Sequence, residues 1–206
     1  MRRTISCYPN LSVAQDLREY TGIREDILQA LKYLAIVEEQ IAAGSRQLVA
    51  WEGLSSAAAV AYGRCFKWSK ARLALPRDFH SNAPRDVQET HEYVIAVRDK
   101  HIAHSENAYE ENRLVVSIEI ENGQAVAVHE VSVEPRRLVA FGDPDVPKLR
   151  RLFDWTLCAV EELLNAEAQK TLEYVRQLDP GQLAQQRMEP MPAFLAEGAH
   201  LATRPR

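Results

Sequence analysis

Between residues 87 and 104 the chain combines a helical apolar stripe with an arginine. Val94, Arg98 and Ile102 recur at a spacing of four, which places them on one face of an α-helix. A guanidinium stays charged and is costly to bury alone, so Arg98 must meet a carboxylate, line a cleft or lie at an interface. His101 and His104 follow within two turns. Imidazoles exchange protons near neutral pH, so this pattern suits proton transfer beside a developing negative charge.

The stretch from Arg98 to His104 resembles the signature of HEPN domains, which are helical bundles. That signature is an arginine, often followed by a polar residue, and then a histidine after four to six residues. Here Asp99 is the polar residue, and five residues separate Arg98 from His104. The earlier stretch Tyr62–Phe66 also looks like that of uncharacterised bacterial proteins of this kind. Motif and helical context together cover roughly residues 21–178.

The resemblance implies a metal-independent endoribonuclease, a toxin or a phage-defence or stress effector, that acts on RNA as a homodimer. It implies that Arg98 stabilises the phosphate and His104 acts as general acid or base, with Asp99 and His101 in the same site. A neutralising protein partner, as in toxin–antitoxin pairs, and no cofactor are expected. The alternative function is a non-catalytic HEPN-like protein-interaction module.

Helix geometry leaves the acting histidine open. Each residue of an α-helix turns about 100°, so residues six apart point about 120° away from each other. His104 would therefore diverge from Arg98, whereas His101 would stay near it. Either the helix ends or kinks near Ile102, or His101 supplies part of the function.

Two other interpretations of this stretch remain. Arg98 and the histidines form a structural network with Glu92, Asp99 or Glu106, or the histidines bind a metal. His101 and His104 have a usable ligand spacing, but His91 lies about 15 Å away along a continuous helix, and there is no HExxH pattern. We therefore expect no metal site, and we expect His91 to be a core histidine.

Basic residues precede the arginine motif. Arg64, Lys67 and Lys70 alternate with Phe66 and Trp68, a combination that can hold a phosphate backbone and stack a base. The sequence thus predicts RNA binding here. The competing interpretation is a solvated helix face whose aromatic rings turn into the core.

Composition narrows the class of protein. The chain has 206 residues, of which 46% are hydrophobic and 26% charged, with a formal charge of −4, so any RNA contact needs a local basic patch. Cys7, Cys65 and Cys158 form no CxxC pair, so no disulfide framework or cysteine zinc site is expected. The first residues of the sequence lack the apolar core of a signal peptide. The longest apolar stretch, Ala57–Ala61, is too short to span a bilayer. We expect a soluble, cytoplasmic protein without a membrane partner.

The hydrophobic periods predict a mainly α fold, a HEPN-like four-helix bundle with a β-hairpin inserted before the last helix. The expected helices span about residues 21–43, 45–75, 81–105 and 145–178, with Ser81 or Asn82 capping the third. Asn122-Gly123 predicts the turn of a hairpin over about 113–134, and a change of phase near His129 predicts a bulge or a strand end. The expected domain is 1–178, followed by a coil tail, 179–206.

Overall fold

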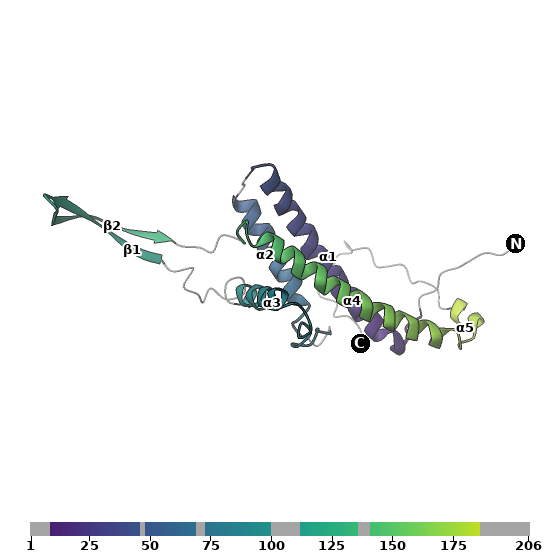
Figure 1. The fold of residues 1–206 in the computed structure, drawn as a ribbon. Helices are drawn as coiled ribbons and strands as arrows, with labels where there is room; N and C mark the ends of the chain where they lie inside the picture. The colour runs from purple at the N-terminus through teal and green to yellow at the C-terminus, as the bar shows by residue number, and fades with distance from the viewer. Residues whose placement is uncertain (1–8, 46–47, 69–72, 100–111, 136–140, 186–206) are drawn as a thin grey trace, which may run out of the picture.

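The chain is mainly helical and carries a two-stranded antiparallel hairpin before its longest helix, as the sequence predicts (Figure 1). The computed structural model describes residues 9–45, 48–68, 73–99, 112–135 and 141–185. Its elements are, in chain order, η1 (Ser12–Ala14), α1 (Gln15–Ala42), α2 (Leu48–Arg64), α3 (Arg85–Val97), β1 (Asn112–Glu121), β2 (Gln124–Pro135), α4 (Val146–Val175) and α5 (Pro180–Gln185).

One hydrophobic core lies between the four longer helices. α1 packs against α2 and α4, and α3 packs against α4 and α2. Tyr62 and Phe153 are the largest fully buried side chains, and Ile23, Ile27 and Leu149 surround them in the core. The helices are apolar mainly on their inward faces. None of the helices in the described ranges is long and apolar enough to cross a membrane.

The predicted second helix was wrong at its C-terminal end. α2 stops at Arg64, where the N–H groups of Cys65 and Phe66 bond to the carbonyls three residues earlier, at 3.0 and 3.2 Å. The N–H of Leu75 donates to the Cys65 carbonyl at 2.7 Å, a contact between residues ten apart that a continuous helix cannot make. The Leu75 side chain is buried in the core.

The predicted start of the third helix was also wrong. Neither Ser81 nor Asn82 caps α3, because residues 78–83 form successive turns that place His80 inside the core. Pro84 has extended dihedrals and directly precedes the helix. At the other end, Arg98 keeps helical dihedrals (φ −58°, ψ −47°) and begins a wider π-helical turn with Asp99.

The C-terminal tail begins with structure that the sequence did not predict. α4 ends at Val175, and the short helix α5 occupies Pro180–Gln185, where coil was expected. Asp179 caps α5, since its carboxylate accepts hydrogen bonds from the N–H groups of Gly181 and Gln182 at 3.0 and 3.2 Å.

The hairpin confirms its predicted turn and bulge. Asn122 and Gly123 both have positive φ (50° and 82°), as a type I′ turn requires. Ser117 pairs with Glu130 and Ile118 with Val128, so His129 is the extra residue of a bulge. The bulge restores the alternation, because it moves Val128 to the face that carries Ile118.

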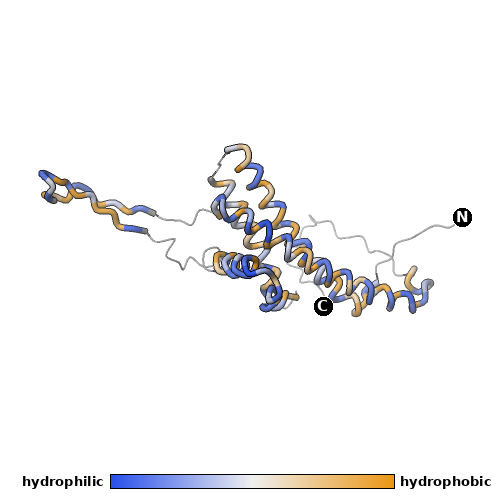
Figure 2. The backbone as a smooth tube through the Cα atoms, in the orientation of Figure 1, coloured by the Kyte–Doolittle hydropathy of each residue, from blue (hydrophilic) through white to orange (hydrophobic). Residues whose placement is uncertain are grey.

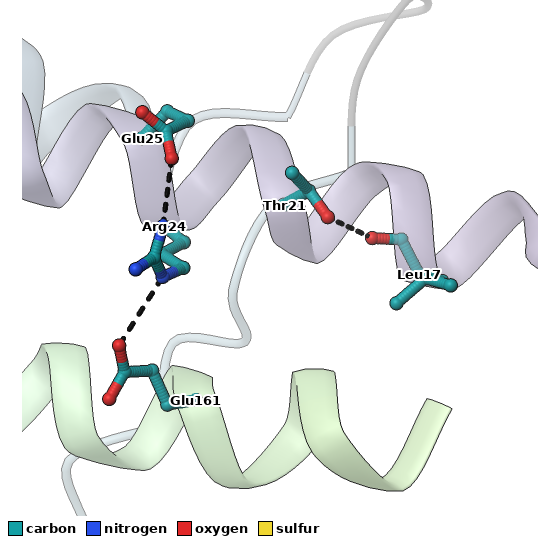
Figure 3. A network of polar contacts seen from close by, with 5 residues as sticks. All are labelled: Leu17, Thr21, Arg24, Glu25 and Glu161. Atoms are coloured by element: carbon teal, nitrogen blue, oxygen red, sulfur yellow. Dashed lines mark hydrogen bonds and ion pairs between the residues drawn. The ribbon is translucent and has the colours of Figure 1, made fainter. Parts of the chain in front are cut away.

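Ion pairs on the surface join α1 to α4 (Figure 3). Arg24 reaches across to Glu161 at 3.3 Å and also contacts Glu25 at 2.9 Å. Arg150 of α4 donates two hydrogen bonds to Glu38 of α1, at 3.1 and 2.5 Å. These pairs fix the register of the two longest helices but add little stability, because exposed ion pairs contribute at most about 1 kcal/mol each.

Candidate functional site

A polar cluster lies inside the core where α2, α3 and α4 meet. The Tyr62 hydroxyl of α2 lies 2.8 Å from Nδ1 of His91 on α3. It also lies 3.4 Å from Nε2 of His80, which belongs to the turns before α3. Nε2 of His80 lies 2.9 Å from the Thr156 hydroxyl of α4. One hydrogen-bond network thus joins three helices and the turns that precede α3.

The contacts fit one arrangement of protons in this cluster. In it the Thr156 hydroxyl donates to the Leu152 carbonyl at 2.8 Å, and its oxygen accepts a hydrogen bond from Nε2–H of His80. The other ring nitrogen of His80, Nδ1, has no hydrogen-bond partner among the residues that the structure describes, and it carries the lone pair. The Tyr62 hydroxyl then donates to His91 Nδ1. Both imidazoles are neutral.

Burial keeps these groups uncharged. It lowers the pKa of His80 to about 3, with a further contribution from the neighbouring His91, and it lowers the pKa of His91 to about 4. Burial also raises the pKa of the Tyr62 phenol well above its usual value. At neutral pH the cluster therefore serves as an uncharged hydrogen-bonded anchor between helices.

Aromatic rings close the cluster off. The rings of His80 and His91 stack with centroids 4.2 Å apart, and Phe66 lies edge-on to His91 at 4.6 Å. Trp155 lies 5.1 Å from His80 on the α4 side. This packing supports a structural role for His91, in agreement with the expected core histidine.

Arg98 lies at the end of α3 directly against α2. Its side chain is 17% exposed, and its stem crosses the backbone of Gly63. A Cβ atom at Gly63 would lie 3.1 Å from Cγ and 3.2 Å from Cδ of Arg98. The absence of a side chain at Gly63 therefore sets where the arginine stem can lie.

Two carboxylates balance the charges around Arg98. The Asp99 carboxylate accepts a hydrogen bond from Nη1 of Arg98 and lies 3.8 Å from Nζ of Lys67. Arg64 lies 3.6 Å from Asp26 of α1. Arg98, Asp99 and Lys67 thus meet where the ends of α2 and α3 lie together, whereas Arg64 pairs with α1. A guanidinium has five N–H donors in all, so the bond to Asp99 leaves Arg98 able to bind an anion.

The two aromatic residues of the basic stretch differ in their environments. Phe66 packs into the core beside Tyr62, His80 and His91. Trp68 is 72% exposed and follows Lys67 in the chain, on the surface. The prediction of rings turned into the core is therefore confirmed for Phe66 and wrong for Trp68.

The structure brings Arg98 and Asp99 together with Lys67, whereas Arg64, the last residue of α2, pairs with Asp26 of α1. Lys70, His101 and His104 lie outside the described residues, as does Glu106 of the suggested network. Within the described ranges, no group of three or more metal-ligating side chains occurs.

Sequence reasoning missed His80, Thr156 and the role of Gly63. His80 lies in a segment without periodicity, so nothing marked it for burial. Thr156 is 76 residues from its partner His80. Gly63 had a signal, because a glycine inside a helical pattern costs stability and often has a packing reason.

Comparisons of the chain with protein-family models, with curated proteins and with solved structures gave no match in any of the three.

We predict that acid destabilises the fold through the two buried histidines. Their pKa values in the folded protein, about 3 and about 4, lie below the unfolded value of 6.5. Below pH 6.5 the unfolded chain therefore binds more protons, and each histidine removes about 1.4 kcal/mol of stability per pH unit until its folded pKa is reached. Because both rings keep some contact with solvent, we expect the free energy of unfolding in urea to be lower at pH 5 than at pH 7 by on the order of 2 to 4 kcal/mol.

Replacement of one buried histidine should reduce this pH dependence. His91→Gln keeps an acceptor for Tyr62 but does not titrate. The difference in unfolding free energy between pH 7 and pH 5 should therefore fall to about half its wild-type value. His129→Gln, on the exposed hairpin, is the control and should leave it unchanged. Equal unfolding free energies of the wild type at both pH values would contradict the neutral cluster.

We also predict that Gly63→Ala moves Arg98 without weakening the fold. Alanine favours the helix by up to about 1 kcal/mol, and the atoms it meets belong to a flexible stem that can shift. Gly53→Ala is a matched control in the same helix, because its Cβ would meet nothing within 4 Å. The Arg98 Nε–H resonance should shift in Gly63→Ala only. An unshifted resonance would show that Gly63 does not position the arginine.

Proposed function

We propose that this protein is a HEPN-like, metal-independent endoribonuclease, a toxin or defence effector that cleaves RNA at a site containing Arg98. The observation that carries the proposal is the placement of Arg98. Its stem lies against Gly63, and its guanidinium bonds to Asp99, which also lies 3.8 Å from Nζ of Lys67. A cation fixed in this way is suited to a phosphate that gains negative charge.

The chemistry follows from the substrate. A base removes the proton of the RNA 2′-hydroxyl, the oxygen attacks the adjacent phosphorus, and the 5′-oxygen leaves with a proton from an acid. In the proposal His104 takes one of these proton-transfer roles, with His101 as the alternative. Arg98 stabilises the pentacovalent phosphate, and Asp99 orients the guanidinium. Two copies contribute to the complete site.

Single-stranded RNA fits the surroundings of the arginine better than duplex RNA. Trp68 exposes most of its ring next to Lys67, and an exposed indole can stack an unpaired base. Lys67 and Arg64 can hold the phosphate backbone beside it. We therefore expect cleavage in loops and unpaired segments.

The second candidate is a non-catalytic HEPN-like interaction module. The bond between Arg98 and Asp99 favours it, because a neighbouring carboxylate can satisfy a mostly buried guanidinium without any ligand. In that case Arg98 supports the helix joint, and the basic surface binds a protein partner.

We predict that Arg98→Ala lowers cleavage of a labelled single-stranded RNA by at least about 100-fold, because it removes the phosphate-stabilising group. Arg85→Ala is the charge-matched control. Arg85 lies at the opposite end of α3, is exposed and pairs with Glu89 at 2.7 Å. It should leave cleavage unchanged. Cleavage should survive EDTA, and a single 2′-deoxy substitution at the cleaved position should block it.

Three results would contradict the ribonuclease. These are a folded wild type without cleavage, cleavage that EDTA abolishes and one divalent ion restores, or equal cleavage by Arg98→Ala. The first result would favour the interaction module. Circular dichroism and urea unfolding of each variant separate loss of function from loss of fold.

A further inference from the structure

Among the residues that the structure describes, the largest group of exposed aliphatic side chains lies on the hairpin. Figure 1 shows the hairpin projecting away from the helices, and the hydropathy colours in Figure 2 show hydrophobic segments along both strands. Apart from Ser117, the side chains from Arg113 to Glu134 are classed as exposed. A two-stranded hairpin alone is marginally stable in water, so this element needs a partner surface.

The register sorts these side chains onto one face. Leu114 pairs with Val133, Val116 with Val131, Ile118 with Val128 and Ile120 with Ala125. The seven larger members of this face are each 43–68% exposed. We call these eight residues the hairpin apolar face. It contains no charged side chain. It extends along the whole length of the strands because two register shifts, at His129 and at Val126, keep Val128 and Ala125 on the same face.

The opposite face carries the charges of the hairpin. Glu134 lies opposite Arg113, Glu130 opposite Ser117, and Glu119 and Glu121 lie toward the turn. This acidic face disfavours a nucleic acid or an anionic lipid surface as the occupant. The occupant must instead offer an uncharged apolar surface of similar length.

We propose that the hairpin apolar face binds the same face of a second copy of this chain. Two identical uncharged faces meet without opposing like charges, and their glutamates stay on the outer sides. Face-to-face packing at about 10 Å makes a four-stranded sandwich related by a two-fold axis. The exposed aliphatic residues on the described helices, such as Ile36 and Val49, are scattered, so no helix offers a face of this extent.

The size of the face sets the expected affinity. An apolar face of this kind amounts to about 400 Å² per copy, comparable to the largest apolar patch on typical monomers. A standard stable interface buries about 800 Å² per partner. The hairpin face alone therefore predicts a weak dimer, with a dissociation constant on the order of micromolar. This dimerisation does not depend on the proposed ribonuclease activity.

The test is sedimentation equilibrium of the full chain across concentrations from about 1 to 100 μM, chosen to bracket that micromolar dissociation constant. The variant Val131→Lys places a charge in the centre of the apolar face, and Ser132→Lys places the same charge one residue away on the opposite face. We expect the wild type and Ser132→Lys to dimerise alike. Val131→Lys should raise the dissociation constant at least 10-fold and should reduce hydrogen-exchange protection of the strands.

Both variants should keep the helical circular dichroism of the wild type, since the hairpin lies away from the described helices. A wild type that is monomeric at every concentration would overturn the proposal, even if its hairpin amides were protected by another part of the same chain. Equal dimerisation of Val131→Lys and wild type would also overturn it and would place the interface on the helices. Both outcomes are independent of ribonuclease activity. An active enzyme would not save the dimer proposal if either outcome occurred, and an inactive protein would not count against it.

Discussion

The hydrogen bond between the Tyr62 hydroxyl and Nδ1 of His91, 2.8 Å long and enclosed by aromatic rings, holds α2 against α3. Tyr62 is fully buried and His91 is partly buried, so loss of this bond would leave the Tyr62 hydroxyl without its partner inside the core. Gly63 follows Tyr62 directly, and Arg98 lies two helical turns after His91. The hydrogen bond that holds Tyr62 beside His91 thus also places the Arg98 stem across Gly63.

In the helical part of the protein, the polar groups of the core are neutral and the charged groups lie toward the surface. The core contains polar groups that are neutral at pH 7, because burial lowers the pKa values of His80 and His91. The fixed charges of Arg98, Lys67 and Asp99 lie at the surface end of the same helix joint. Neutral hydrogen-bonded groups in the core can fix the position of a nearby cation without the desolvation penalty that burial of a charge carries. This arrangement is consistent with the proposed phosphate site.

The sequence predicted features that depend on local patterns. The amphipathic faces of α1 and α4, the Asn122-Gly123 turn and the bulge at His129 all follow from spacing and turn chemistry. The small exposed fraction of Arg98 followed from its place on an apolar stripe. Features set by distant contacts were not predictable in this way. α2 ends early because Leu75 returns to Cys65, and His80 is buried because Thr156, on another helix, offers it a hydrogen bond.

A double-mutant cycle of Tyr62→Phe and His91→Phe, measured by urea unfolding at pH 7, tests the central interaction most directly. Each single variant leaves one buried polar group without its partner and should lose about 1–3 kcal/mol. The double variant removes both groups, so its loss should be smaller than the sum by at least about 1 kcal/mol. Additive losses, within about 0.5 kcal/mol, would show that this bond does not hold α2 against α3.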